Sequence, residues 1–472
     1  MSTPDQPPVD QGPADELVRR FSPSERFLLV GLVCMVTVVA TESMAVTTVM
    51  PLVERDLGQL SLYGWAFSAF FIGNLVGSVA GGRATDRMAP VLPLAAGVGV
   101  FVAGLLVGGL APTMLVLVLG RLLQGVGAGV VPAVMYVCVG RGFPAALRPK
   151  VFAITSSAWV VPSLVAPLLA AWVAQAVGWR WVFLGLVPVA VVVAALALPS
   201  IRMVRTGAAD PDRPTTPVGK VVLLAAGATA LLAGLTAHTW WVLVPLVAVG
   251  LALGVPAFRS LTPVGTMSAR PVLPAAVLLR GVLTFAFFGA DAYISLALTS
   301  VRGTSTQYAG FVLAASSLTW TAGSWFQARF HRTWGEARLV RLGGSVLTVG
   351  LLVLAASVSS AVPVGVWMFG SLLAGFGMGT AFAPISTTTL AAAEPGHEGE
   401  ATSALQLSDV LGTALGTGLA GVVVSLGEHS TVGRSAPLVA VYVGTATVAL
   451  VVALLAGRLR MDRVPVPSST AS

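Results

Sequence analysis

Long apolar segments alternate with short polar loops along almost the whole chain of 472 residues. Each segment holds about 20 to 30 residues, which as an α-helix is long enough to cross a bilayer core of about 30 Å. Continuous apolar segments also exclude an outer-membrane barrel, whose strands alternate between apolar and polar residues. We therefore predict an all-α integral membrane protein with fourteen transmembrane helices, at residues 27–50, 62–82, 91–111, 113–138, 151–174, 181–199, 218–237, 240–258, 272–300, 307–328, 338–357, 363–392, 401–426 and 436–457.

Two stretches of the chain repeat one another at an offset of 250 residues. R-L-L-Q-G-V-G-A-G begins at Arg121 and S-L-L-A-G-F-G-M-G begins at Ser371, so two leucines and three glycines recur at the same spacing. Glu42 and Asp291 lie 249 residues apart. Parallel repeats of this kind build some transporters. The offset predicts two homologous six-helix bundles, with the seventh and eighth segments as a hairpin between them. Because these two segments are only about 20 residues long, a re-entrant or surface hairpin is the alternative to two spans.

The orientation follows from the positions of the basic residues. Of 27 lysines and arginines, 21 lie on the side of the N-terminus and four on the opposite side. The positive-inside rule then places both termini in the cytoplasm. The expected parts are a disordered cytoplasmic tail at 1–26, an N-terminal six-helix bundle at 27–199, a cytoplasmic linker at 200–217, an extra transmembrane hairpin at 218–258, a C-terminal six-helix bundle at 259–457 and a cytoplasmic tail at 458–472.

The composition excludes other classes of protein. Hydrophobic residues make up 56% of the chain and charged residues 10%, against about 25% charged in soluble domains. The net charge of +8 does not indicate nucleic-acid binding, because the basic residues are spread over short loops rather than gathered in a patch. Arginine supplies 25 of the 27 basic residues, which is typical of proteins from GC-rich bacterial genomes. We expect a multi-pass protein of a bacterial inner membrane.

Four short motifs lie within or beside the predicted helices. They are T-E-S-M-A-V-T-T-V-M-P at 41–51, G-R-A-T-D-R at 82–87, L-G-R-L-L-Q-G-V-G-A-G at 119–129 and P-S-L-V-A-P-L-L-A-A at 162–171. Together they resemble motifs of the major facilitator superfamily, and in particular of its fourteen-helix drug:proton antiporter branch. In the last motif Pro167 is kept, while alanines stand where the family has glycines.

The resemblance implies roles for individual residues. It implies a cytoplasmic gating loop at Asp86 and Arg87 with Arg141 as a candidate partner, for which a solvated turn is the alternative. It also implies that the first and fourth helices meet at a central cavity. The residues of its helix-packing motifs are Gln124, Gly125, Gly127 and Pro167.

Charged side chains within spans are the candidate functional residues, because each costs about 2.5–3.5 kcal/mol to insert. Glu42 and Arg121 both lie ~12–14 Å below the same membrane surface at 1.5 Å per residue. They can pair if their helices are neighbours. Because arginine stays protonated, the pair is either a proton switch that opens when the arginine is displaced or a static ion pair between two helices. The charged residues within spans are Glu42, Arg121, Arg280, Asp291 and Asp409.

The second half of the chain carries two candidate carboxylates. Asp291 stands where Glu42 stands in the first half, and nearby aromatic rings suit a lipophilic cation through cation–π contact. Packing in the core is the alternative for those rings. Asp409 resembles an acidic position of some fourteen-helix members and is a candidate for coupling, whereas Arg280 is expected to snorkel to a helix end. The aromatic candidates are Phe285, Phe288 and Tyr293.

The sequence contains no metal-ligand spacing, nucleophile elbow or phosphate-binding loop with its lysine. We therefore expect no enzyme, cofactor or metal, and transport that uses an ion gradient. The predicted function is a monomeric secondary transporter, a proton-coupled exporter of amphipathic or cationic drugs that works by alternating access. The alternatives are an exporter of a lipid or endogenous metabolite on the same fold and a membrane-embedded transferase.

Overall fold

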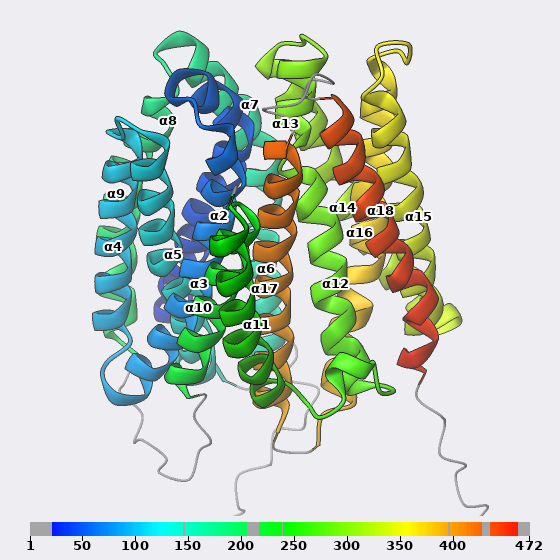
Figure 1. Cartoon of the computed structure of the whole chain (residues 1–472). Helices are drawn as coiled ribbons and strands as arrows, with labels where there is room; N and C mark the ends of the chain where they lie inside the picture. Colours follow the sequence, from blue (N-terminus) through cyan, green and yellow to red (C-terminus); the bar gives the residue numbers. More distant parts are fainter. Residues whose placement is uncertain are drawn as a thin grey trace, which may run out of the picture.

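The computed structural model of the chain describes residues 21–144, 147–204, 217–237, 239–394, 397–426 and 435–460. Within these ranges every regular element is helical (Figure 1). Twelve of the described helices are long and apolar enough to cross a membrane. Helix α14 and the interrupted pair α6–α7 complete the fourteen spans, which confirms the predicted fold class.

The helices form two groups with a hairpin between them in sequence. The first group is α2 (Pro23–Leu57), α3 (Tyr63–Arg87), α4 (Val91–Gly109), α5 (Met114–Gly142), α6 (Arg148–Ser157), α7 (Val160–Ala176), α8 (Arg180–Leu184) and α9 (Leu186–Arg202). The hairpin is α10 (Val218–Leu235) and α11 (Trp240–Leu261). The second group is α12 (Leu273–Asp291), α13 (Ile294–Leu296), α14 (Thr306–Trp334), α15 (Glu336–Ser357), α16 (Gly365–Ala391), α17 (Glu398–Ser425) and α18 (Ser435–Leu455). Short turns of 3-10 helix cover Leu60–Leu62, Thr266–Ser268 and Ala456–Leu459, and a π-helical turn covers Ala297–Val301.

Two predicted spans are broken where the sequence pattern is continuous. The span predicted at 151–174 divides into α6 and α7 around Trp159. Pro162 stands in the first turn of α7, where its missing N–H needs no partner, so a helix that begins here tolerates it. The span predicted at 272–300 ends its regular α-helix at Asp291 and continues through a π-helical turn. Such turns are often found at functional sites.

Glycines let the helices of each group pack at close range. A methyl group on Gly125 of α5 would lie 1.9 Å from the carbonyl oxygen of Phe70 on α3, and one on Gly127 would lie 2.4 Å from that of Gly97 on α4. Helix α5 therefore lies between α3 and α4, with no room for a side chain at these two glycines. The second group repeats this arrangement, with α16 between α14 and α15, at Gly375, Gly377 and Gly379.

The hairpin lies outside both groups, against one helix from each. Helix α10 packs on α3 and α17, and α11 packs on α10 (Figure 1). Leu232 of α10 is fully buried beside Gly418 of α17 and Ser68 of α3. Trp240 and Trp241 at the start of α11 are 72% and 62% exposed, as is usual for aromatic residues at a membrane interface.

The molecule has two faces that differ in how the groups meet. We call the face with residues 21 and 460 the terminal face, and the other, where α2 ends and α3 begins, the distal face (Figure 1). Hydrogen bonds between the groups lie toward the distal face. Tyr63 donates to the carbonyl of Ala292 at 3.4 Å, Ser68 to that of Ala414 at 2.8 Å, and Ser295 to that of Thr48 at 2.9 Å. These bonds hold the two groups together at the distal face.

Candidate functional site

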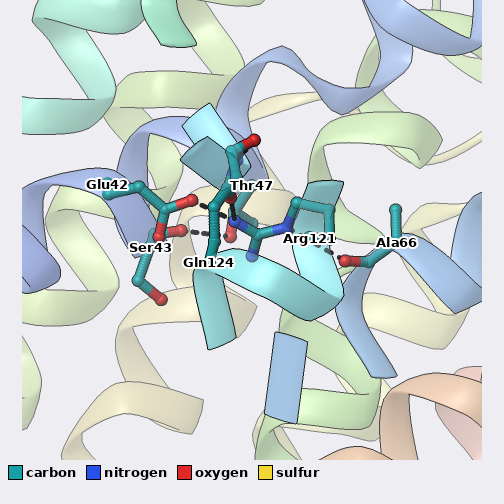
Figure 2. Close-up of polar contacts among 7 residues, drawn as sticks. Glu42, Ser43, Thr47, Ala66, Arg121 and Gln124 are labelled. Carbon is teal, nitrogen blue, oxygen red and sulfur yellow. Dashed lines mark hydrogen bonds and ion pairs between the residues drawn. The ribbon is translucent and has the colours of Figure 1, made fainter. Parts of the chain in front are cut away.

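A buried ion pair joins α2 to α5 in the first group. Glu42 is 0% and Arg121 2% exposed, and Nη1 of Arg121 donates to Oε1 of Glu42. Nε of Arg121 donates to the carbonyl of Ala66 on α3 at 3.0 Å (Figure 2). The guanidinium lies over the Phe70 ring, 4.4 Å from its centre. Glu42 and Arg121, which the sequence places at the same depth in the membrane, are thus in direct contact in the structure. The second carboxylate oxygen of Glu42 is buried without a hydrogen-bond partner.

Gln124 belongs to this polar network as well as to the packing motif. It lies one helical turn beyond Arg121 and is fully buried. Its Oε1 accepts a hydrogen bond from Nη1 of Arg121 at 2.5 Å (Figure 2). Its Nε2 donates to the carbonyl of Gly104 on α4 at 2.9 Å. From the sequence, Gln124 is assigned to helix packing alone, because it stands within a run of regularly spaced glycines.

Asp291 and Arg121 line one small cavity from opposite groups of helices. The cavity measures about 30 Å³, which is room for a water molecule rather than for a drug. In the described part of the chain no hydrogen bond or ion pair engages the carboxylate of Asp291. Asp291 is the last residue of α12, at the point where the regular α-helix ends. The cavity is lined by Ser43, Met44, Thr47, Phe67, Phe71, Arg121, Phe288, Asp291, Ala292 and Thr417.

The three aromatic candidates occupy different places. Phe288 lines the cavity. Tyr293 instead lies in the contact at the distal face, where its hydroxyl donates to the carbonyl of Thr417 at 2.9 Å and its ring lies 5.3 Å from that of Tyr63. Phe285 packs through its backbone on Gly416 of α17. Among the three, the structure therefore supports only Phe288 as a residue that can touch a ligand in this cavity.

Other aromatic residues near the cavity were not predicted. Phe67 and Phe71 of α3 line it directly. The Phe71 ring lies 6.3 Å from that of Phe288, and the Trp320 ring of α14 lies 6.1 Å from Phe288. The chain has 19 phenylalanines and 11 tryptophans, so spacing along the sequence could not single these out.

Arg280 and Asp409 form a separate polar cluster toward the terminal face. Arg280 donates to the carbonyl of Phe382 at 3.0 Å and to the Ser386 hydroxyl, and it stacks on the Phe382 ring. Its side chain is 2% exposed, so the expected snorkelling to the helix end is wrong. Asp409 is close enough for an electrostatic interaction with Arg280, and Thr284 donates a hydrogen bond to its backbone carbonyl. Asp409 does not line the central cavity.

The predicted gating residues lie at the terminal face. The side chain of Asp86 is outside the described part of the structure. Arg87 ends α3 with an exposed side chain. Arg141 in the last turn of α5 donates to the carbonyl of Thr85 at 3.4 Å, so it links α5 to the end of α3.

Pro167 lies where the two groups touch. A methyl group on Gly310 of α14 would be 3.1 Å from the carbonyl oxygen of Pro167 on α7. This proline therefore contributes to contact between the groups, in addition to packing within its own group.

Two helical groups with a charged cavity at their interface are the architecture of those membrane transporters that are built from parallel repeats. The chain belongs to the Major Facilitator Superfamily, whose family model matches residues 32–417. A protein of Mycobacterium tuberculosis named as a probable multidrug-efflux transporter is 26% identical over 416 residues, 84% of this chain and 87% of that protein. The Bacillus subtilis multidrug transporter protein MdtP is 23% identical over 421 residues, 85% and 76% of the two chains.

Solved structures share the fold at low sequence identity. A bacterial homologue of the human lysosomal transporter Spinster, in an inward-facing and unoccupied conformation, superposes with a TM-score of 0.67 at 15% identity over 93% of this chain and 97% of that one. An auto-inhibited peptide transporter of the POT family has a TM-score of 0.67 at 18% identity, over 93% and 99% of the chains. Both are transporters of the same architecture.

Proposed function

We propose that this protein is a proton-coupled antiporter that exports amphipathic, cationic compounds by alternating access. The observation that carries the proposal is that Arg121 of one group and Asp291 of the other line the same cavity, while Arg121 is paired with Glu42. Asp291 offers an unpaired negative charge to a cation, and Glu42 offers a site for a proton. The relatives named as multidrug-efflux transporters support the same assignment.

The orientation completes the proposal. The arginine-rich loops lie at the terminal face, so we assign this face, with both termini, to the cytoplasm of a bacterium. Contact between the groups at the distal face then closes the cavity toward the outside. In the proposed cycle a cation reaches Asp291 from the cytoplasmic side, and a proton from outside neutralises Glu42 as the cation leaves. Nothing in the cycle requires a second copy of the chain, and we propose that it works as a monomer.

The test is substrate-induced proton movement in everted membrane vesicles with an acidified lumen. Addition of a lipophilic cation such as ethidium should release protons from vesicles that contain the wild type. Glu42→Gln keeps the size of the side chain but cannot carry a proton, so release should fall to the level of vesicles without the protein. Glu336→Gln, outside the cavity at the start of α15, is the control and should behave as wild type. Equal proton release from Glu42→Gln and wild type would remove Glu42 from the coupling step.

A further inference from the structure

We propose that Gln124 is a positioning residue that holds Arg121 in place when Glu42 takes up a proton. The proton then changes the charge that faces the cavity, and the arginine does not have to move. This inference rests on the proposed function and adds how a proton on Glu42 weakens the binding of a cation at Asp291.

Most of the contacts of Arg121 do not depend on Glu42. Its Nε is held by the Ala66 carbonyl at 3.0 Å, and its face rests on the Phe70 ring. The atom Nη1 donates to both Glu42 and Gln124. When Glu42 becomes neutral and its attraction weakens, the same nitrogen keeps a neutral acceptor on its own helix (Figure 2).

Gln124 is itself fixed in one orientation. Its Nε2 donates to the Gly104 carbonyl at 2.9 Å, so its Oε1 has to face Arg121. The residue is fully buried and spans the gap between α4 and the guanidinium. An amide held at one end and acting as an acceptor at the other is suited to locating a cation without titrating.

The second half of the chain shows that the fold does not need this amide. At the offset of 250 residues, Ala374 stands in place of Gln124 and Ser371 in place of Arg121. A methyl group on Gly104 would lie 2.5 Å from the backbone nitrogen of Gln124, and one on Gly350 would lie 2.6 Å from the backbone nitrogen of Ala374. The backbones therefore pack in the same way with alanine as with glutamine. The glutamine accompanies the arginine, which points to a role in holding Arg121.

A stationary arginine makes the charge at the cavity depend on the protonation of Glu42. With Glu42 ionised, the three groups Glu42, Arg121 and Asp291 sum to one negative charge, which favours a cation. With Glu42 neutral, the sum is zero and the positive charge of Arg121 repels the cation. Asp291 is titratable as well, and its protonation would act in the same direction by removing a negative charge. The other titratable groups nearby are the hydroxyls of Tyr63, Tyr293 and Tyr442, and α4 has none. Cation binding should therefore weaken as the pH falls.

If Gln124 is replaced by an apolar residue and Glu42 is neutral, the only acceptor left for Nη1 of Arg121 is the uncharged oxygen of Glu42, which is a weaker partner than the carboxylate. The guanidinium is then free to turn toward Asp291, the unpaired carboxylate across the cavity. An arginine on Asp291 competes directly with the cation. The defect should therefore arise only at low pH, because at high pH the ionised Glu42 still holds Arg121.

The experiment measures the Kd of ethidium for the purified full-length protein in lipid nanodiscs at pH 8 and pH 6. For Gln124→Leu we expect the Kd of ethidium to stay within twofold of wild type at pH 8. At pH 6 we expect the Kd to be about tenfold higher than in wild type, since the interaction between two unit charges in a partly hydrated cavity changes binding by about this factor. Gln124→Met is the second variant if Gln124→Leu does not fold. Gln406→Leu, exposed on α17, is the matched control and should show the wild-type ratio.

A companion measurement replaces the change of pH by a substitution. In Glu42→Gln the carboxylate is permanently neutral, so adding Gln124→Leu should weaken ethidium binding about tenfold at both pH values. If Gln124→Leu alone weakens ethidium binding equally at pH 6 and pH 8, Gln124 has a purely structural role and the inference is overturned. A Kd unchanged from wild type at both pH values would overturn it as well. A wild-type Kd independent of pH would overturn the proposed coupling site together with this inference. A wild type that responds to pH, beside a Gln124→Leu with the same ratio of Kd values, would overturn the inference alone.

Discussion

Replacing Gly125 with alanine tests whether close helix contact positions the ion pair. A methyl group at this position would lie 1.9 Å from the Phe70 carbonyl oxygen, so α3 and α5 must separate by about 1.5 Å to reach ordinary contact. Arg121 and Ala66 lie one turn away on the same two helices and are joined at 3.0 Å. A separation of this size takes their hydrogen bond beyond its normal range.

We expect Gly125→Ala to lower the free energy of unfolding by about 1–3 kcal/mol, which is typical of overpacking in a close-packed interior. Binding of a cation should weaken as well, because Arg121 loses its contact with α3. The measurements are thermal unfolding and ethidium binding in lipid nanodiscs.

Gly140 supplies the matched control on the same helix. A methyl group there meets nothing within 4 Å, so Gly140→Ala should leave binding unchanged and stabilise the helix by about 0.5–1 kcal/mol. If Gly125→Ala unfolds at the same temperature as Gly140→Ala or higher, the close approach of α3 and α5 does not support the site and the reasoning is refuted.

Two further predictions concern the cavity and the hairpin. Asp291→Asn should weaken ethidium binding at least tenfold at pH 8, because the cation uses the unpaired carboxylate. A neutral compound of similar size should bind as it does to wild type. Equal losses for the two compounds in equilibrium binding would contradict this. Thr239→Cys, between α10 and α11, should react with a membrane-impermeant thiol reagent on intact cells, whereas Ser268→Cys at the terminal face should react only after the cells are opened. If Thr239→Cys also reacts only after the cells are opened, the hairpin lies on the cytoplasmic surface.

Much of the fold was predictable because a span must be apolar over its whole length. Apolar segments therefore located the helices, and counting residues from the membrane surface placed Glu42 and Arg121 at one depth. The break after Asp291 was not predictable, because the residues that follow are apolar and continue the pattern. It depends on how α12 meets its neighbours.

The remaining parts of the site depend on contacts between distant segments. Gln124 belongs to the network because the Gly104 carbonyl of another helix faces it, and one stretch of sequence cannot show this. Phe71 reaches the cavity because α3 packs against the second group. Tyr293 was a candidate by its nearness to Asp291 in sequence, but the end of α12 directs it into the contact at the distal face.

In the proposed alternating-access cycle, the position of the hairpin means that lipid has to rearrange when the two groups move. Leu232 fills a notch formed by Ser68 of one group and Gly418 of the other, so the notch exists only while these groups touch at the distal face. When they separate, α10 must leave at least one of them, and acyl chains have to fill the space. Lipid tails are as apolar as leucine, so this exchange is governed by packing rather than by the hydrophobic effect. The rate of alternation should therefore depend on the thickness and fluidity of the bilayer.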